Sequence, residues 1–156
     1  MSVVVEVGPG GFGFCAAHTG RHAGRFEPLH GHMFQVRLRV CGQPDQAGMV
    51  MDFATLKAAL RQAVGPLRRR TLLAAADADP ADPDGLVRFG DAVKRYALPA
   101  ADLMLLPVGN TTTEELAGYL LDRLAPVLSA AAGLVWAELV LAEAPGVAAR
   151  VRRSLC

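Results

Sequence analysis

The clearest hydrophobic pattern along the chain is the alternation over residues 30–40. Every second position carries a histidine or a large apolar residue, and the positions between them hold glycine, methionine, glutamine or arginine. Because successive side chains of a strand point to opposite faces of a sheet, this pattern predicts a strand with two histidines on its apolar face. The residues of that face are His30, His32, Phe34, Val36, Leu38 and Val40.

Other apolar runs predict further strands near both ends of the chain. A short strand is expected over residues 3–7, where a run of glycine and proline ends it, and an extended path resumes over residues 12–18. Residues 134–143 predict a buried strand, followed by a last short strand over 147–151. The remaining connections are expected to be a loop at 19–28, a turn at 42–48 and a short strand end at 49–51.

Two segments carry the signals of helices. Asp52 is a favourable N-cap for a helix over residues 53–64, in which apolar residues recur at helical spacing until Gly65 and Pro66 interrupt it. A capping box, with Thr112 as N-cap and Glu115 three residues later, begins a second helix. The apolar face expected for that helix is Leu116, Tyr119, Leu120, Leu124 and Val127.

The region between the two helices is the least regular part of the pattern. Residues 74–85 are rich in alanine, aspartate and proline, which predicts a flexible insertion, and a short helix is expected around residues 89–96. The whole chain, residues 1–156, therefore predicts one α+β domain with an antiparallel sheet, two helices on one face and an Asp/Pro-rich insertion at about 74–106.

Composition and charge restrict the partners that we expect. Sixteen Lys and Arg residues against fifteen Asp and Glu residues give a net charge of +1, so neither nucleic acid nor an anionic membrane is an expected partner. The sequence has no apolar run of membrane-spanning length, and its first residues lack the features of a signal peptide. The three cysteines, Cys15, Cys41 and Cys156, are few and widely spaced, which favours reduced thiols in a cytoplasmic protein.

The histidines carry the most specific chemical signal. All four lie within fifteen residues, and His18 would join His30 and His32 if its strand pairs with theirs. Catalytic zinc commonly takes three protein ligands and keeps one open position, and three neutral imidazoles leave it strongly Lewis acidic. A zinc site on these three residues is therefore predicted. The alternative is that His30 and His32 are hydrogen-bonded residues at a strand end.

The order of several short motifs resembles one family. Along this chain the motifs are, in order, FCAAH at 14–18, LHGH at 29–32, GMVMDF at 48–53, TTEELA at 112–117 and a strand ending in Glu143. In this combination the chain resembles the 6-pyruvoyl-tetrahydropterin synthase / 6-carboxy-tetrahydropterin synthase family over residues 3–73 and 107–147.

The resemblance implies a fold, a metal and a substrate class. The fold would be a tunnelling fold, a four-stranded antiparallel sheet with two helices in the order ββααββ, assembled into barrels as trimers that stack into hexamers. Zn²⁺ would be bound by His18, His30 and His32, and a pterin would be held by Glu143. A carboxylate can accept two parallel hydrogen bonds from the pterin edge. Thr112 and Thr113 are further expected substrate-binding residues, whereas without the resemblance Glu143 would be a surface carboxylate at a strand end.

The chain departs from the family at its expected general base. The family's synthases use a cysteine shortly before the HGH segment, and Phe26 holds that position here, next to Glu27. Some family variants have a glutamate there and are associated with cleaving a dihydroneopterin-type side chain to a 6-hydroxymethyl product. Glu27 is therefore the candidate base, with a solvated loop glutamate as the alternative.

A second departure lies after the first helix. The family shows an Asp-His proton relay there, whereas this chain has Arg68 and Arg69 in the aligned run. Arginine cannot act as a base near neutral pH, but it can bind a phosphate or carboxylate, so these residues would bind an anionic substrate tail or remain solvated at a helix end. His22 is a candidate replacement base, and an exposed loop histidine is the alternative.

Three functions remain open from the sequence. The first is a zinc-dependent lyase or aldolase that acts on a 7,8-dihydroneopterin-type substrate, with Glu27 as base. The second is a family member that acts on a different small substrate in a specialised biosynthetic pathway. The third is a pterin-binding protein without turnover. The alternative to the lyase is synthesis of 6-pyruvoyl- or 6-carboxy-tetrahydropterin, with a general base at a different position of the chain.

Overall fold

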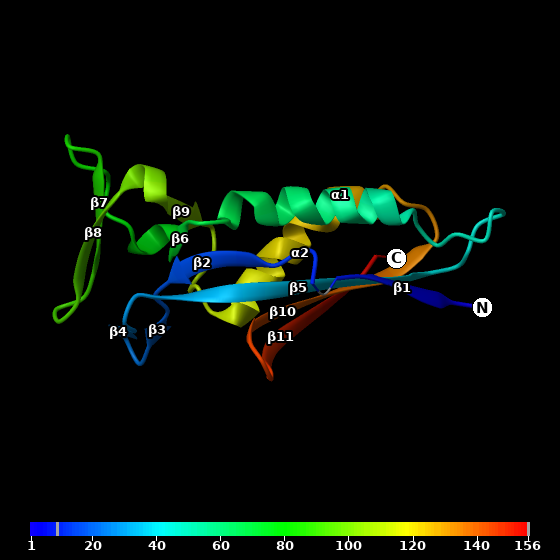
Figure 1. The fold of residues 1–156 in the computed structure, drawn as a ribbon, viewed down its shortest axis with the longest axis horizontal. Helices are drawn as coiled ribbons and strands as arrows, with labels where there is room; N and C mark the ends of the chain where they lie inside the picture. The colour runs from blue at the N-terminus through cyan, green and yellow to red at the C-terminus, as the bar shows by residue number, and fades with distance from the viewer. Residues whose placement is uncertain (9, 156) are drawn as a thin grey trace.

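A computed structural model describes residues 1–8 and 10–155 of the chain, so Cys156 lies outside the described residues. Within that part, a seven-stranded sheet has the strand order β11-β10-β5-β2-β6-β9, and β1 pairs with β5. Figure 1 shows the sheet with α1 along one side of it. The strands of the sheet are β1 (Val3–Val7), β2 (Phe14–His18), β5 (His30–Gly42), β6 (Thr71–Ala74), β9 (Leu103–Leu106), β10 (Leu134–Ala144) and β11 (Val147–Ser154).

The long strands confirm the predicted antiparallel arrangement, and two short strands extend it. β5 pairs antiparallel with β1, β2 and β10, and β10 pairs antiparallel with β11. β6 and β9 add to the other edge in parallel, since β2 pairs parallel with β6 and β6 with β9. The sheet is therefore mixed and not purely antiparallel, and strands also lie between the two helices along the chain.

The two predicted helices form where their caps are. Helix α1 (Phe53–Val64) begins after Asp52, whose carboxylate accepts hydrogen bonds from the N–H groups of Ala54 and Thr55. Helix α2 (Thr113–Ser129) begins after Thr112, whose hydroxyl accepts from the N–H of Glu115. The apolar positions of α1 expected at helical spacing include Phe53, which is wrong, because Phe53 is 48 % exposed and does not belong to the buried face. On α2 the residues Leu116, Leu120 and Leu124 are buried, and Tyr119 and Val127 are half-buried.

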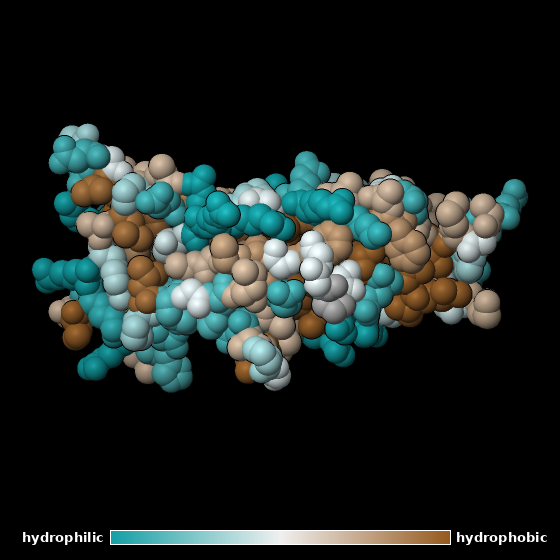
Figure 2. Space-filling model, in the orientation of Figure 1, coloured by the Kyte–Doolittle hydropathy of each residue, from teal (hydrophilic) through white to brown (hydrophobic). Residues whose placement is uncertain are grey.

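The main core lies between the two helices and the sheet. Alternate residues of β5 from Phe34 to Val40 are buried there, as the alternation predicts, together with Leu56 and Leu60 of α1. Apolar burial of this extent is the main stabilising contribution in a domain of this size. Neither helix is long and apolar enough, within the described residues, to span a membrane. Figure 2 shows hydrophobic residues gathered at the end of the molecule where β1 begins.

One expectation for the region between the helices is wrong. No helix forms around residues 89–96, because this segment is an antiparallel hairpin of β7 (Leu86–Gly90) and β8 (Arg95–Pro99). The hairpin shares a second apolar cluster with Phe26 and Leu103, so the insertion has packing of its own. In Figure 1 it lies at the end of the molecule opposite to β1. Short 3-10 helices complete this region, η1 (Gly65–Leu67), η2 (Ala75–Asp77) and η3 (Ala100–Asp102).

Two smaller expectations also change. The loop predicted at 19–28 contains a small hairpin of β3 (Arg21–His22) and β4 (Arg25–Phe26), joined through Ala23 and Gly24 at positive φ. The short strand end expected at 49–51 does not form, because these residues lie in bends before α1. The side chain of Asp45 organises that turn by accepting hydrogen bonds from the N–H groups of Ala47 and Met49.

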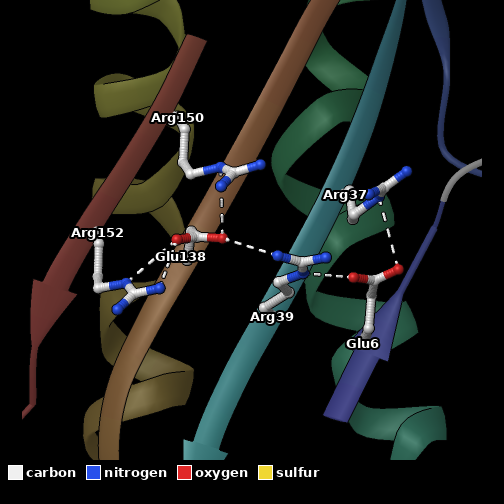
Figure 3. A network of polar contacts seen from close by, with 6 residues as sticks. All are labelled: Glu6, Arg37, Arg39, Glu138, Arg150 and Arg152. Atoms are coloured by element: carbon white, nitrogen blue, oxygen red, sulfur yellow. Dashed lines mark hydrogen bonds and ion pairs between the residues drawn. The ribbon is translucent and has the colours of Figure 1, made fainter. Parts of the chain in front are cut away.

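The face of the sheet away from the helices carries an ion-pair network (Figure 3). Glu138 of β10 is 1 % exposed and accepts two hydrogen bonds from Arg152 of β11, at 2.8 and 3.1 Å. Arg39 of β5 lies 3.3 Å and Arg150 lies 3.6 Å from the other carboxylate oxygen. Glu6 of β1 extends the network by pairing with Arg37 and Arg39. These pairs join four neighbouring strands on the surface that the helices leave uncovered.

Candidate active site

Three histidines converge where β2 and the start of β5 lie side by side. His18 is directly opposite His30 in the antiparallel register, and His32 is opposite Ala16. The ring centroids are 4.7 Å apart for His18 and His30, 5.2 Å for His18 and His32, and 4.8 Å for His30 and His32. One nitrogen from each ring lies within 4.8 Å of the others, so the group could hold a metal ion. The sequence predicts this convergence from the alternation over residues 30–40 and from the pairing of the strand of His18 with that strand.

Two backbone carbonyls fix the orientation of these imidazoles. His18 Nδ1 donates to the carbonyl oxygen of Thr111 at 2.7 Å, and His30 Nδ1 donates to that of Pro28, also at 2.7 Å. A carbonyl can only accept, so Nδ1 carries the proton in both residues and Nε2 keeps its lone pair. Histidines that ligate metals are commonly oriented in this way by their second nitrogen. Both rings are therefore prepared to ligate through Nε2.

The buried nitrogen of His18 is the strongest sign that a ligand belongs there. His18 is 4 % exposed, and its Nε2 has no hydrogen-bond partner among the described residues. A buried polar atom without a partner is rare and unfavourable in a folded protein. Burial lowers the pKa of His18, against the opposing effects of the Thr111 carbonyl and Glu143, so the ring is neutral near pH 7. A neutral imidazole is the form that binds a metal, so the residues fit zinc.

Glu143 and Thr113 form the second part of the site. The hydroxyl of Thr113, the first residue of α2, donates to Glu143 Oε2 near the end of β10 at 2.6 Å. Glu143 and His32 both line a hollow of about 570 Å³ with Met33 and Gln35. The residue expected to hold a pterin and one of the three histidines therefore line the same hollow.

The two neighbouring threonines have different positions. Thr113 contacts Glu143, whereas the hydroxyl of Thr112 caps α2. Thr112 therefore has a structural contact that accounts for its place in the motif, and only Thr113 contacts the predicted substrate-binding carboxylate.

Glu27 lies on the segment that leads from β4 to the metal group. Its backbone N–H donates to the Gly20 carbonyl at 2.9 Å, and its carbonyl accepts from the Thr19 hydroxyl at 2.6 Å. Its side chain is exposed and lies over Gly20, since a Cβ added to Gly20 would be 3.4 Å from Glu27 Oε2 and 3.6 Å from Asn110 Oδ1. The backbone of Glu27 is therefore held by hydrogen bonds, whereas its carboxylate is exposed.

The segment before α2 forms a wall of the site that the sequence reasoning missed. Thr111 orients His18, and its hydroxyl donates to the carbonyl of Thr19. The side-chain amide of Asn110 accepts from the N–H of Arg21 and donates to its carbonyl, at 2.9 Å each. The only sequence signal was a polar run, NTTT, directly before a helix.

The remaining candidate residues, His22, Arg68 and Arg69, differ in their relation to the three histidines. His22 is exposed in the small β3–β4 hairpin opposite Arg25, and it does not join the three-histidine group. Arg69 is exposed and lines a hollow of about 460 Å³ that His32 and Cys15 also line. Arg68 is exposed and does not line that hollow. Of these residues, Arg69 is the one that shares a hollow with a histidine of the group.

Family and structural comparisons agree with this geometry. The family model for 6-pyruvoyl tetrahydropterin synthase matches residues 10–154. The chain belongs to this family. A protein of Methanocaldococcus jannaschii, provisionally named 6-carboxy-5,6,7,8-tetrahydropterin synthase, is 27 % identical over 140 residues, 81 % of each chain.

Solved structures of the family share the fold across the whole chain. The 6-pyruvoyl tetrahydropterin synthase of Plasmodium vivax is 26 % identical in sequence and superposes with a TM-score of 0.89. The match covers 99 % of each chain. Two further structures of the P. vivax protein, each 25 % identical over 99 % of both chains with a TM-score of 0.89, carry alanine or cysteine in place of a glutamate described as a catalytic residue. The mixed sheet, the two helices and the insertion therefore occur together in a family member.

Proposed function

We propose that the protein is a zinc-dependent lyase that acts on the side chain of a 7,8-dihydroneopterin-type pterin. The observation that carries this proposal is the hollow that His32 and Glu143 both line, together with the buried Nε2 of His18, which has no hydrogen-bond partner among the described residues. A metal group and a carboxylate that open into one space suit a substrate with a flat hydrogen-bonding edge and a hydroxylated side chain. Family membership supports a pterin as that substrate.

His18, His30 and His32 would hold the zinc ion through three neutral imidazoles. When bound, zinc supplies Lewis acidity that favours loss of a proton from a hydroxylated side chain. The chain's own contribution is orientation, because the carbonyls of Thr111 and Pro28 hold two of the rings with Nε2 unprotonated.

Glu143 would hold the pterin ring. Its two oxygens can accept parallel hydrogen bonds from the 2-amino and N3–H groups of the ring. The Thr113 hydroxyl already donates to Oε2, which fixes the carboxylate in one orientation before the substrate binds. Such an arrangement reduces the ordering that binding requires.

Glu27 would act as the general base in a side-chain cleavage. It would take the proton from the hydroxyl of the second side-chain carbon, and the bond between the first and second carbons would break. The electron pair stays on the pterin-side carbon, which is then protonated, so the products are a 6-hydroxymethyl pterin and a two-carbon aldehyde. The exposed carboxylate on a fixed backbone supports this role, as does the catalytic glutamate of the P. vivax protein.

One alternative is 6-pyruvoyl- or 6-carboxy-tetrahydropterin synthesis with a relocated base. The name of the M. jannaschii relative favours this reaction class. A recruited family member that acts on a non-pterin anion is a further alternative, and Arg69 beside the histidine group is the residue that would bind it. Arg68 is a weaker candidate than Arg69 because it lines neither hollow of the histidine group, and His22 is exposed in the β3–β4 hairpin and does not join the three histidines.

The active form proposed for this reaction is a homo-oligomer, a hexamer of two stacked trimers. The edge strand β11, which pairs only with β10 among the described residues, supports it, because uncovered strand edges pair readily with other strands. Light scattering tests this assembly, and a monomer with full activity would contradict it.

The reaction is tested with zinc-loaded protein and two substrates, 7,8-dihydroneopterin and its triphosphate. Products are identified by mass spectrometry for the wild type, Glu27→Gln and His32→Ala. We expect a 6-hydroxymethyl product that both variants lose. A 6-pyruvoyl or 6-carboxy product would establish the first alternative, and no product from either substrate despite bound zinc would move the assignment to a non-pterin substrate.

A further inference from the structure

The β7–β8 hairpin binds the chain on both sides of Glu27. The N–H of Phe26 donates to Asp91 Oδ2 at 2.8 Å, and the carbonyl of Phe26 accepts from Lys94 Nζ, also at 2.8 Å. Two residues after Glu27, the N–H of Leu29 donates to the Tyr96 hydroxyl at 3.1 Å. Three polar side chains of one hairpin therefore bind backbone groups of a segment about 65 residues away in sequence.

Apolar contacts hold the same two parts together. Phe26 is 6 % exposed and packs in one cluster with Val87 and Phe89 of β7. The rings of Phe26 and Phe89 are 6.4 Å apart between centroids, and Phe89 stacks on Tyr96 at 5.1 Å. Ring pairs at these distances contribute beyond their burial. The hairpin is thus packed against the residue directly before Glu27.

The backbone contacts leave little freedom between Phe26 and His30. Hydrogen bonds with Gly20 and Thr19 hold the backbone of Glu27. Side chains of the β7–β8 hairpin bind the backbone N–H groups of Phe26 and Leu29. Pro28 has no N–H, and its carbonyl accepts from His30 Nδ1. The backbone N–H groups of residues 26, 27 and 29 are therefore all bound, while the Glu27 side chain remains exposed.

We infer that the β7–β8 hairpin positions Glu27, with Asp91, Lys94 and Tyr96 as its positioning residues. The catalytic consequence rests on the proposed function, since it assigns Glu27 the role of base. The reason is geometric: a carboxylate on a fixed backbone keeps its distance to the substrate, and a displacement of about 1 Å in an active site can lower the rate about 100-fold. The hairpin thus acts on the reaction only through Glu27.

The arrangement also explains why a charged residue is used at the hairpin turn. Asp91 Oδ1 accepts from the N–H groups of Val93 and Lys94, and Oδ2 reaches Phe26. One carboxylate therefore shapes the turn and binds the Glu27 segment at the same time. An amide at this position would present an NH₂ group to one of these donors and would lose that contact.

The first experiment measures amide hydrogen exchange of residues 26–29 in the full-length wild type and in Tyr96→Phe. This variant removes one hydroxyl and keeps the ring stack. We expect exchange of the Leu29 amide to rise about five-fold, which corresponds to a net hydrogen bond of about 1 kcal/mol. The control is Arg88→Met, which removes the ion pair with Asp82 on the same hairpin and leaves residues 26–29 untouched. Equal exchange in the wild type and Tyr96→Phe would overturn the inference.

The second experiment is a double-mutant cycle on turnover. We expect Tyr96→Phe to lower kcat about ten-fold with KM and zinc content unchanged, whereas the same change in a Glu27→Gln background has no further effect. If Tyr96→Phe lowers kcat as much in the Glu27→Gln background as in the wild type, Tyr96 does not act through Glu27, and the inference is overturned. Absence of turnover in the wild type would reject the proposed function alone, because the exchange measurement decides the positioning independently.

Discussion

Thr113 and Glu143 are joined by a hydrogen bond of 2.6 Å that connects the first turn of α2 to the end of β10. This contact couples the first residue of α2 to the predicted pterin carboxylate. The two residues are thirty positions apart in sequence, and only the packing of α2 on β10 brings them together. The orientation of Glu143 therefore depends on where α2 begins.

The first prediction concerns pterin binding by this pair. Glu143→Gln removes the charge and one acceptor, so we expect the Kd of a dihydropterin to rise about 10- to 100-fold, as for loss of a charged hydrogen bond. Thr113→Val is expected to weaken binding about five-fold, because the carboxylate keeps its charge but loses its orientation. Fluorescence titration measures both. Glu114→Gln, an exposed carboxylate of the same helical turn, is the control, and an equal effect there would contradict the assignment.

The second prediction concerns the metal ligands. His18→Ala and His32→Ala are each expected to abolish stoichiometric zinc, because a catalytic site with two protein ligands binds zinc poorly. His22→Ala is the matched control and is expected to retain one zinc per chain, since His22 lies outside the group. Metal analysis after dialysis gives the stoichiometry. Removal of zinc from the wild type with a chelator is expected to lower its Tm, because a ligand of the native state stabilises it.

The third prediction concerns the buried carboxylate on the open face of the sheet. Glu138→Gln removes the charge that accepts hydrogen bonds from the arginines and replaces one acceptor oxygen by an NH₂ group, so we expect the free energy of unfolding to fall by about 2 kcal/mol, as for loss of a hydrogen bond to a charged group. Glu6→Gln, in the same network but about one-third exposed, is expected to lower it by less than about 1 kcal/mol. Urea denaturation compares the two variants. Equal losses would indicate that burial of the carboxylate does not determine its contribution.

The fourth prediction concerns stability in acid. Hydrogen bonds from the N–H groups of Lys94, Phe26 and Val93 lower the pKa of Asp91 from 3.8 to about 2. A carboxyl group whose pKa is lower in the folded state stabilises the fold above its unfolded pKa and loses that contribution as the pH falls through the folded one. We therefore expect Asp91→Asn to lose less stability than the wild type between about pH 4 and pH 2. Thermal unfolding at a series of pH values measures this difference, and parallel curves would contradict it.

The sequence was sufficient to predict that the three histidines lie together and to predict the elements around them. His30 and His32 were predicted on one face because a strand has a period of two, and the pairing of β2 with β5 then places His18 beside them. The capping residues Asp52 and Thr112 likewise defined the starts of both helices. These features depend on local patterns of a few residues, which a sequence displays directly.

The features that were missed depend on contacts between distant segments. Phe89 and Tyr96 are seven residues apart, a spacing that suits one face of a helix, yet they are opposite each other in the β7–β8 hairpin. The carbonyl of Thr111 orients His18, and a backbone carbonyl has no signature in the sequence. The parallel strands β6 and β9 are four residues each, too short for a pattern that distinguishes them from loops.

The thirteen residues of β5 carry three different sets of contacts on one strand. His30 and His32 begin it, Phe34 to Val40 fill the core at alternate positions, and Arg37 and Arg39 point to the opposite face. A deletion of one residue early in β5 would exchange the two faces for everything beyond it. This strand can therefore vary during evolution by substitution but not by a change in length. Length variation is expected instead in the turn at 43–48, which lies outside the sheet.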